Sequence, residues 1–196
     1  FTSQGCSSCP PADALLGELA REAGVVALAW HVDYWNYLGW ADPFADKRWT
    51  ERQRGYAARL RQEVYTPALV ANGARMAVGS NRAAVRQAMR DAPMPNLPMA
   101  LRRIGGMLEV ELPEVPAEIE LSLVVYDGRQ DTPVARGENG GRRLTEFQVV
   151  RDLRPVHRVP GRTMLAGIAP DQGTAVLARD AAWRVVGAAE VRPAGA

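Results

Sequence analysis

The chain has two cysteines in 196 residues, and both lie in one Cys6-Ser7-Ser8-Cys9 motif near its start. A pair with this spacing can close a small structural disulfide, supply half of a zinc site or form a redox-active dithiol. No further cysteine remains to build a framework of cross-links. The motif therefore predicts a local site and not a disulfide scaffold.

The residues around the motif favour the redox interpretation. A zinc site needs further thiolate or imidazole ligands, and the two histidines, His31 and His157, lie in different halves of the chain. Phe1-Thr2 reads as the end of a strand, and a helical stretch from about Pro10 to Glu22 follows the cysteines. Free N–H groups and the partial positive charge of a helix N-terminus stabilise a thiolate. A static disulfide stays open as the alternative.

In a redox site of this kind, we expect the two cysteines to have different roles. Cys6 precedes the helix and is predicted to be the more exposed and more acidic thiol, and hence the nucleophile. Its thiolate would form a mixed disulfide with a substrate, and Cys9 would then resolve it. The Ser7-Ser8 dipeptide between them does not fix the direction of electron flow, so reduction, oxidation and isomerisation all stay open.

The first 92 residues alternate strand-like and helix-like segments, which is typical of an α/β fold. The mostly apolar run Val25–Val32 predicts a strand buried in a parallel sheet. Two short apolar runs flank Asn72-Gly73, a strong hairpin signal. Asp42 is predicted to cap one helix and Gly79-Ser80 another.

Beyond the proline-rich segment Pro93–Pro98, which reads as a linker, the pattern changes to short strands separated by turns. Turn signals include Asp127-Gly128, Asn139-Gly140-Gly141, Pro160-Gly161 and Asp171-Gln172-Gly173. The sequence thus predicts an α/β domain over residues 1–92 and an all-β, sandwich-like domain over residues 93–196. The predicted strands are Met107–Leu112, Ile119–Tyr126, Arg143–Val150, Thr163–Ile168, Thr174–Ala178 and Trp183–Val191.

The segment CSSCP with its following helix, together with VYTPALVANG further along, resembles the thioredoxin superfamily. In that superfamily a Thr-Pro pair with a cis peptide bond faces the CxxC motif. The resemblance implies that Thr66-Pro67 is this pair and that its backbone can bind an extended substrate peptide. An ordinary trans proline at the start of a strand is the alternative. By this resemblance the α/β domain is expected to be thioredoxin-like.

A closer resemblance rests on FTSQGCSSCPPAD, HVDYWNYLGWADPF and YTPALVANG taken together. These segments look like a bacterial family of thioredoxin-like proteins of unknown function, often described as secreted. From NGGRRLTEFQVVR to the C-terminus the likeness is looser. It implies export to the periplasm or beyond, and it names no substrate.

The aromatic segment HVDYWNYLGW follows the predicted strand at its carboxyl end, where α/β proteins place ligands. Trp35 and Trp40 are therefore candidate substrate-binding residues, although such aromatics can also seal an interface between two domains. Asp33 or His31 is the candidate proton acceptor for Cys9, since thiol exchange requires one. The alternative for both is a structural hydrogen bond at the end of a strand.

Composition narrows the classes of partner. The 24 Lys and Arg residues nearly balance the 22 Asp and Glu residues and are spread along the chain. The sequence therefore has no concentrated basic patch of the kind that binds nucleic acid. No apolar run is long enough to span a bilayer. No metal or cofactor is expected. Because the chain lacks a starting Met, an upstream segment is expected to have been removed or left out.

These observations predict an oxidoreductase that exchanges thiols and disulfides with a protein or peptide partner. One alternative is a non-catalytic thioredoxin-fold binding module whose disulfide is structural. Another is a thiol peroxidase, which also uses an activated cysteine and would consume peroxide rapidly when reduced. The substrate, the oligomeric state and the role of the β domain do not follow from the sequence.

Overall fold

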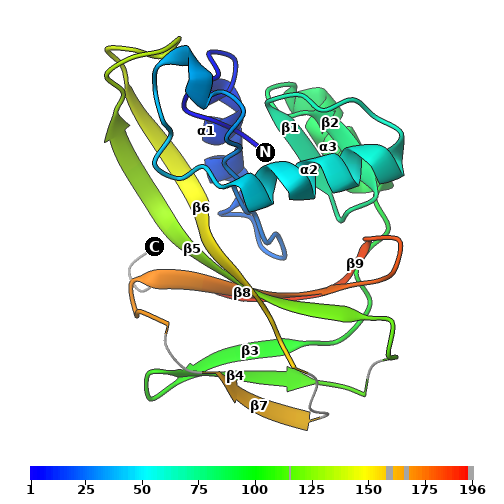
Figure 1. The fold of residues 1–196 in the computed structure, drawn as a ribbon. Helices are drawn as coiled ribbons and strands as arrows, with labels where there is room; N and C mark the ends of the chain where they lie inside the picture. Colours follow the sequence, from blue (N-terminus) through cyan, green and yellow to red (C-terminus); the bar gives the residue numbers. More distant parts are fainter. Residues whose placement is uncertain (115, 158–160, 166–167, 194–196) are drawn as a thin grey trace.

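The computed structural model describes residues 1–114, 116–157, 161–165 and 168–193. Helices occupy the first part of the chain, and beyond α3 the described residues form strands, turns and loops without a helix (Figure 1). In chain order the elements are α1 (Pro10–Leu19), the short 3-10 helix η1 (Asn36–Leu38), α2 (Lys47–Leu60), β1 (Ala68–Ala71), β2 (Arg75–Val78), α3 (Arg82–Asp91), β3 (Ala100–Ile104), β4 (Met107–Leu112), β5 (Glu120–Pro133), β6 (Arg143–Pro155), β7 (Gly161–Leu165), β8 (Gln172–Arg179) and β9 (Val185–Val191).

The hairpin predicted around Asn72-Gly73 is confirmed. Strands β1 and β2 pair antiparallel, with Ala71 opposite Arg75. Residues 72–74 connect the strands, and Asn72 and Gly73, the central residues of the turn closed by the Ala74 N–H and the Ala71 carbonyl, both have positive φ angles, of 48° and 68°. The hairpin therefore follows from local sequence alone.

Both predicted helix caps are wrong. Helix α2 begins after Asp46, whose carboxylate accepts a hydrogen bond from the Arg48 N–H at 2.8 Å. Asp42 instead accepts main-chain hydrogen bonds from Gln4 and Phe44. Helix α3 begins after Asn81, because Gly79 is still engaged with the hairpin through its N–H and the Pro67 carbonyl.

The predicted strand Val25–Val32 forms only isolated parallel bridges, between His31 and Thr2 and between Ala29 and Val149 of β6. The second bridge ties the first part of the chain to the second. A hydrophobic cluster crosses the same boundary, since Trp30 and Trp49 pack with Val124, Tyr126, Val150, Ala175 and Leu177. The two predicted domains thus share a core.

Two antiparallel sheets make up the second part. One has the strand order β6-β5-β8-β9 and the other β3-β4-β7. Their facing side chains form the largest cluster of buried apolar residues, with Leu108 and Val110 from the smaller sheet and Leu123 and Val176 from the larger one. Burying one face of each sheet against the other explains the alternating burial along β4.

Strand boundaries differ from the prediction at several turn signals. Asp127-Gly128 lies inside β5, which passes through it with a register shift at Val125/Tyr126. Gln172 and Gly173 belong to β8. Strand β3 was not predicted, because two arginines interrupt its apolar pattern. Pro160 lies outside the described residues, and Gly161 begins β7.

Strands β5 and β6 are longer than their neighbours in the sheet and extend past them to the N-terminal part of the chain. The loop between β5 and β6 lies near the start of α1 (Figure 1). Helix α1 packs on β6, where the Phe147 ring lies so close to Gly17 that no Cβ atom would fit. This contact places the last turn of α1 against a strand from the second half of the chain.

Candidate functional site

Cys6 and Cys9 form a disulfide at the N-terminus of α1. Cys9 directly precedes the helix, and its carbonyl accepts hydrogen bonds from the N–H groups of Ala12 and Asp13. Pro10 and Pro11 occupy the first turn, where missing N–H groups cost little. The motif therefore sits at the helix end where a thiolate is stabilised.

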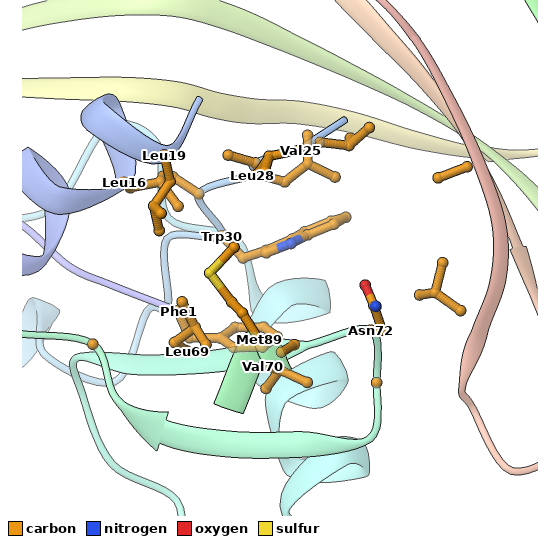
Figure 2. Close-up of a pocket in the computed structure, with 18 of the residues that line it drawn as sticks. Phe1, Leu16, Leu19, Val25, Leu28, Trp30, Leu69, Val70, Asn72 and Met89 are labelled. Carbon is orange, nitrogen blue, oxygen red and sulfur yellow. The ribbon is translucent and has the colours of Figure 1, made fainter. Parts of the chain in front are cut away.

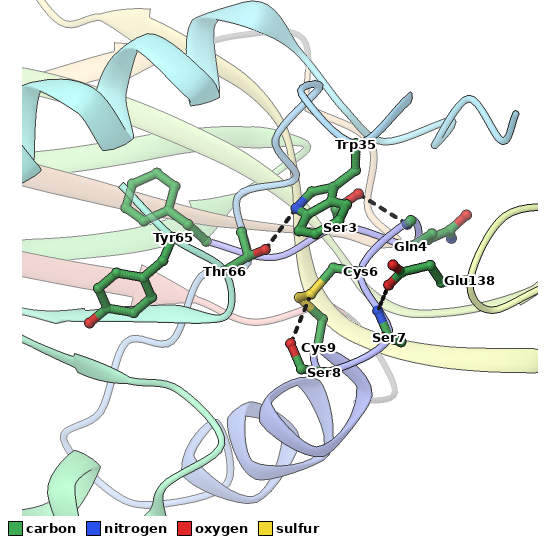
Figure 3. The surroundings of a disulfide bond; sticks show 12 residues. Ser3, Gln4, Cys6, Ser7, Ser8, Cys9, Trp35, Tyr65, Thr66 and Glu138 are labelled. Carbon is green, nitrogen blue, oxygen red and sulfur yellow. Dashed lines mark hydrogen bonds between the residues drawn. A yellow bond between two sulfur atoms is a disulfide. The ribbon is translucent and has the colours of Figure 1, made fainter. Parts of the chain in front are cut away.

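The exposure expected for Cys6 is not found in the oxidised protein. Cys6 is 1% exposed and Cys9 is fully buried, so exposure does not distinguish them. The intervening serines are exposed instead, and the Ser8 Oγ lies 3.4 Å from the Cys6 Sγ (Figure 3). The disulfide is thus covered by its own loop and lies just beneath the surface.

The Thr66-Pro67 peptide bond is cis, as the resemblance to the thioredoxin superfamily implies. Thr66 and Trp35 are among the residues around the disulfide (Figure 3). The Trp35 Nε1 donates a hydrogen bond of 2.8 Å to the Thr66 Oγ1. Trp35 also packs against Gly5, where an added Cβ would lie 2.8 Å from the Trp35 Cβ. Trp35 therefore joins the Thr66 segment, through its indole N–H, to the cysteine loop, through its Cβ atom.

A loop from the second half of the chain holds the cysteine motif. Asn139 is fully buried, and its Nδ2 donates to the carbonyls of Gln4, at 2.9 Å, and Cys6, at 3.0 Å. The Glu138 carboxylate accepts a hydrogen bond of 3.0 Å from the Ser7 N–H. The sequence pattern at Asn139-Gly140-Gly141 predicts only a turn, so it identifies neither residue as part of the site.

We expect Asn139→Ala to destabilise the protein by about 1–3 kcal/mol, because the buried Gln4 carbonyl loses its donor and the Cys6 carbonyl keeps only the Cys9 N–H. Urea unfolding followed by fluorescence measures the loss. Arg142→Ala is the matched control, since the exposed Arg142 side chain donates to the Asn139 Oδ1 and its removal leaves the main-chain hydrogen bonds of residue 142 and the Asn139 Nδ2 contacts in place. Equal, small losses in both variants would show that Asn139 does not hold the loop.

Trp40 lies between the cysteine loop and the loop that joins β5 to β6. Its Nε1 donates a hydrogen bond of 2.9 Å to the Gln4 Oε1. A Cβ atom added at Gly137, in the β5–β6 loop, would lie 3.3 Å from the Trp40 Cβ, so the two residues lie close together. The position of Trp40 fits the alternative in which an aromatic residue fills the interface between the N-terminal and C-terminal parts of the chain. Trp35, in contrast, lies beside Thr66.

A buried cluster of ionisable side chains lies behind the motif. The His31 Nδ1 is 2.8 Å from the Asp42 Oδ2, which also accepts the Gln4 N–H. Burial raises the pKa of Asp13 to about 6 and that of Glu146 to about 7. Burial alone would lower the pKa of His31, but the charge of Asp42 and its hydrogen bond raise it above its ordinary value. Glu146, on β6, was not predicted.

The two proton acceptors predicted from sequence occupy different surroundings. His31 belongs to the buried cluster. The Asp33 carboxylate accepts a hydrogen bond of 2.5 Å from the Thr50 hydroxyl, and the Asp33 N–H donates to the Thr50 Oγ1. These contacts fit the alternative of a structural hydrogen bond at the end of a strand. His157 is exposed. Among the residues that the structure describes, no three His, Cys, Asp or Glu side chains are placed to hold a metal ion.

No described helix is both long and apolar enough to cross a membrane.

Comparison with known proteins gives a family and a solved relative. No curated protein matches the chain. The crystal structure of a protein from Agrobacterium tumefaciens is 30% identical and superposes with a TM-score of 0.83, covering 100% of this chain and 93% of that one. The model of the family described as DUF1223, a protein of unknown function, matches residues 1–186. The chain therefore belongs to the DUF1223 family.

Proposed function

We propose that this protein is a thioredoxin-like thiol-disulfide oxidoreductase, with Cys6 and Cys9 as its redox pair. One observation carries the proposal. The disulfide at the start of α1 and the cis Thr66-Pro67 segment come together, although they lie far apart in the chain. In this assignment residues 1–92 are the thioredoxin-like part, and residues 93–196 form a sandwich-like part that holds the cysteine loop.

Substrate binding in this proposal uses the main chain of Thr66. Within the described residues, the Thr66 N–H and C=O make no hydrogen bond. An extended peptide can pair with them by β-augmentation, which brings its sulfur to the cysteine loop without a deep pocket. Trp35, hydrogen-bonded to the Thr66 hydroxyl, holds this segment in place and offers an aromatic face beside it.

The exchange itself is balanced without a cofactor. In the reducing direction, the Cys6 thiolate attacks one sulfur of a substrate disulfide, the substrate S–S bond breaks, and the other substrate sulfur leaves as a thiolate that takes up a proton. Cys9 then loses its proton and attacks the Cys6 sulfur. The protein ends as the disulfide and the substrate as two thiols. The oxidising direction is the reverse sequence.

A second candidate is a binding module with a static disulfide. The observation that favours it is that both cysteines are buried and that Asn139 donates a hydrogen bond to the Cys6 carbonyl. Such a protein would keep the Thr66 edge for recognition while the sulfur atoms stay inert. Export to an oxidising compartment suits both candidates, because disulfides persist there.

The trapping experiment separates these candidates. Reduced Cys9→Ser protein is mixed with a peptide that contains one disulfide, and the products are analysed by mass spectrometry without reductant. We expect a mixed disulfide through Cys6 that dithiothreitol releases. The double variant Cys6→Ser/Cys9→Ser is the control and should form none. Failure of Cys9→Ser to form the adduct, or rapid peroxide consumption in place of exchange, would contradict the proposal.

A further inference from the structure

The loop that joins β5 to β6 brings an excess of positive charge to the cysteine motif. Arg136, Arg142 and Arg143 lie in this loop or at its end, and all three side chains are exposed. The Glu138 carboxylate accepts a hydrogen bond from the cysteine loop, and the Asn139 amide donates two. These contacts occupy the acidic residue of the loop and fix the backbone that carries the arginines beside the disulfide.

Two of these arginines line an open hollow next to the motif. The hollow has a volume of about 480 Å³, and its lining residues are Ser7, Pro10, Pro11, Arg142, Arg143 and Leu144. Ser7 lies between the two cysteines in the sequence, and Pro10 directly follows Cys9. The hollow therefore adjoins the disulfide, and no acidic side chain lines it among the described residues.

A larger cavity of about 790 Å³ lies between α1, β1 and β9. Its walls are mainly aliphatic, with Leu16 and Leu19 on one side and Leu69 and Val70 on the other (Figure 2). Neither cysteine lines this cavity. Recognition of groups next to a substrate sulfur therefore belongs to the hollow and not to the cavity.

The arginines of the hollow form no ion pair within the part of the chain that the structure describes. The Arg142 side chain donates to the neutral amide oxygen of Asn139, at 2.9 Å. Asp131 interacts with Arg143 only at longer range, and its carboxylate is already paired with Arg129 at 3.2 Å. In contrast, two exposed arginines of α3 pair with carboxylates on and just after α1. The charge at the hollow is thus available to an external anion.

The hollow also lies on the side of the disulfide away from the proposed peptide-binding edge. Thr66 lies on one side of the two sulfur atoms, and Ser7 and Glu138 lie on the other (Figure 3). A peptide that pairs with Thr66 and brings its sulfur to Cys6 would therefore continue past the disulfide toward the arginines.

We propose that this hollow binds carboxylate side chains of the substrate, so that the protein selects disulfides in acidic segments of a polypeptide. The inference rests on the proposed function and adds a substrate class to it. A guanidinium can bind a carboxylate through two parallel N–H···O hydrogen bonds, which fixes orientation as well as charge. Arg142 and Arg143 are the specificity-determining residues, and Arg136 on the same loop adds to the positive field that steers an acidic partner.

Exchange rates with matched peptides test the selection. The peptides contain the same disulfide and differ only in the residues beside the cysteines, which are Glu, Gln or Lys. Each rate with the reduced protein is divided by the rate of the same peptide with uncharged dithiothreitol, which corrects for the reactivity of the peptide itself. At low ionic strength we expect the Glu peptide to react at least about five-fold faster than the Gln peptide, and the Lys peptide to react most slowly. In about 1 M NaCl, where the screening length is about 3 Å, the difference should fall below about two-fold. Equal corrected rates for the Glu and Lys peptides at low salt would overturn the inference.

A pair of double variants locates the selection. Arg142→Gln/Arg143→Gln should lower the ratio of the Glu and Gln rates to about one, and the ratio cancels any effect on Cys6 itself. Arg21→Gln/Arg102→Gln is the matched control, since it removes the same charge from two exposed positions, just after α1 and on β3. The control should keep the ratio. A ratio that falls equally in both variants would show that net charge, and not the hollow, selects the peptide.

A binding measurement separates this inference from the chemistry. Fluorescent Glu and Gln peptides with serine in place of each cysteine are titrated with the oxidised protein, and anisotropy reports their binding. We expect the Glu peptide to bind at least about five-fold more tightly, and Arg142→Gln/Arg143→Gln to abolish the difference. That preference without any exchange would refute the proposed oxidoreductase and leave the acidic-segment site standing. Exchange with no preference in rate or in binding would overturn the site and leave the oxidoreductase standing.

Discussion

Cys6→Ser is expected to reduce the rate of disulfide exchange by more than about a thousand-fold, because removing a covalent nucleophile leaves only binding. The rate is measured with the reduced protein and a disulfide-bonded peptide, followed by the appearance of peptide thiols. Cys9→Ser should still complete the first attack and stop at the mixed disulfide. The two variants therefore differ in product as well as in rate.

Ser7→Ala is the matched control for this loss. Ser7 lies in the same loop and is exposed, and its main-chain N–H still reaches Glu138 after the substitution. We expect its exchange rate to stay within a few-fold of the wild type. If Cys9→Ser loses the first attack and Cys6→Ser keeps it, the roles assigned from the position before α1 are reversed.

Glu146→Gln is expected to stabilise the protein at pH 8 by about 1–3 kcal/mol, since each unit of pKa shift corresponds to about 1.4 kcal/mol. Burial raises the pKa of Glu146 to about 7, above its ordinary value of 4.5. Above that pH the folded protein must hold a buried carboxylate near Asp13 and Asp42, and the charge of His31 and a hydrogen bond from Gln4 offset this cost only in part. Glutamine fills the same space without the charge.

The stability of the wild-type protein is expected to fall as the pH rises, for the same reason. Between the unfolded and folded pKa values of Glu146 and Asp13, the folded state binds more protons, so stability falls as pH rises from about 4 to about 7. The pKa of His31 is also raised, so His31 stabilises the folded protein while it is protonated. That stabilisation is lost as the pH rises through its folded pKa. Asp42 has the opposite sign, since its pKa is lowered and its contribution is lost on acidification.

Urea unfolding across this pH range measures the effect. Glu146→Gln should flatten the fall in unfolding free energy, whereas Glu51→Gln, an exposed carboxylate on α2, should leave it unchanged. A wild-type stability that rises with pH from 5 to 8, or an equal slope in both variants, would show that Glu146 is ionised in the folded protein throughout.

Local sequence patterns predicted the structure correctly where the conformation of a few neighbouring residues is enough to determine it. Asn72-Gly73 accepts the positive φ angles of a tight hairpin, and the cysteines and prolines at positions 6–11 mark the start of α1. Asp42 was predicted as a cap for a similar local reason. Its carboxylate is taken instead by His31 and by the Gln4 N–H, partners that only the folded chain brings to it.

The contribution of the second half to the site was not predictable from local patterns. Asn139 and Glu146 reach the cysteine region because β5 and β6 run on past the predicted turn at Asp127-Gly128. A glycine in a strand usually signals a turn or a bulge, and the register shift at Val125/Tyr126 lets the strand continue. Pairing between Ala29 and Val149 adds a contact that no periodicity encodes.

The reduction potential of the Cys6–Cys9 pair tests most directly whether the two cysteines are a redox couple. The protein is equilibrated in dithiothreitol buffers of known potential, and the fraction of disulfide is read by thiol alkylation and mass spectrometry. We expect a potential above roughly −300 mV with rapid equilibration, as for catalytic disulfides. A potential below roughly −300 mV with slow reduction would contradict the claim and identify the Cys6–Cys9 bond as a structural disulfide.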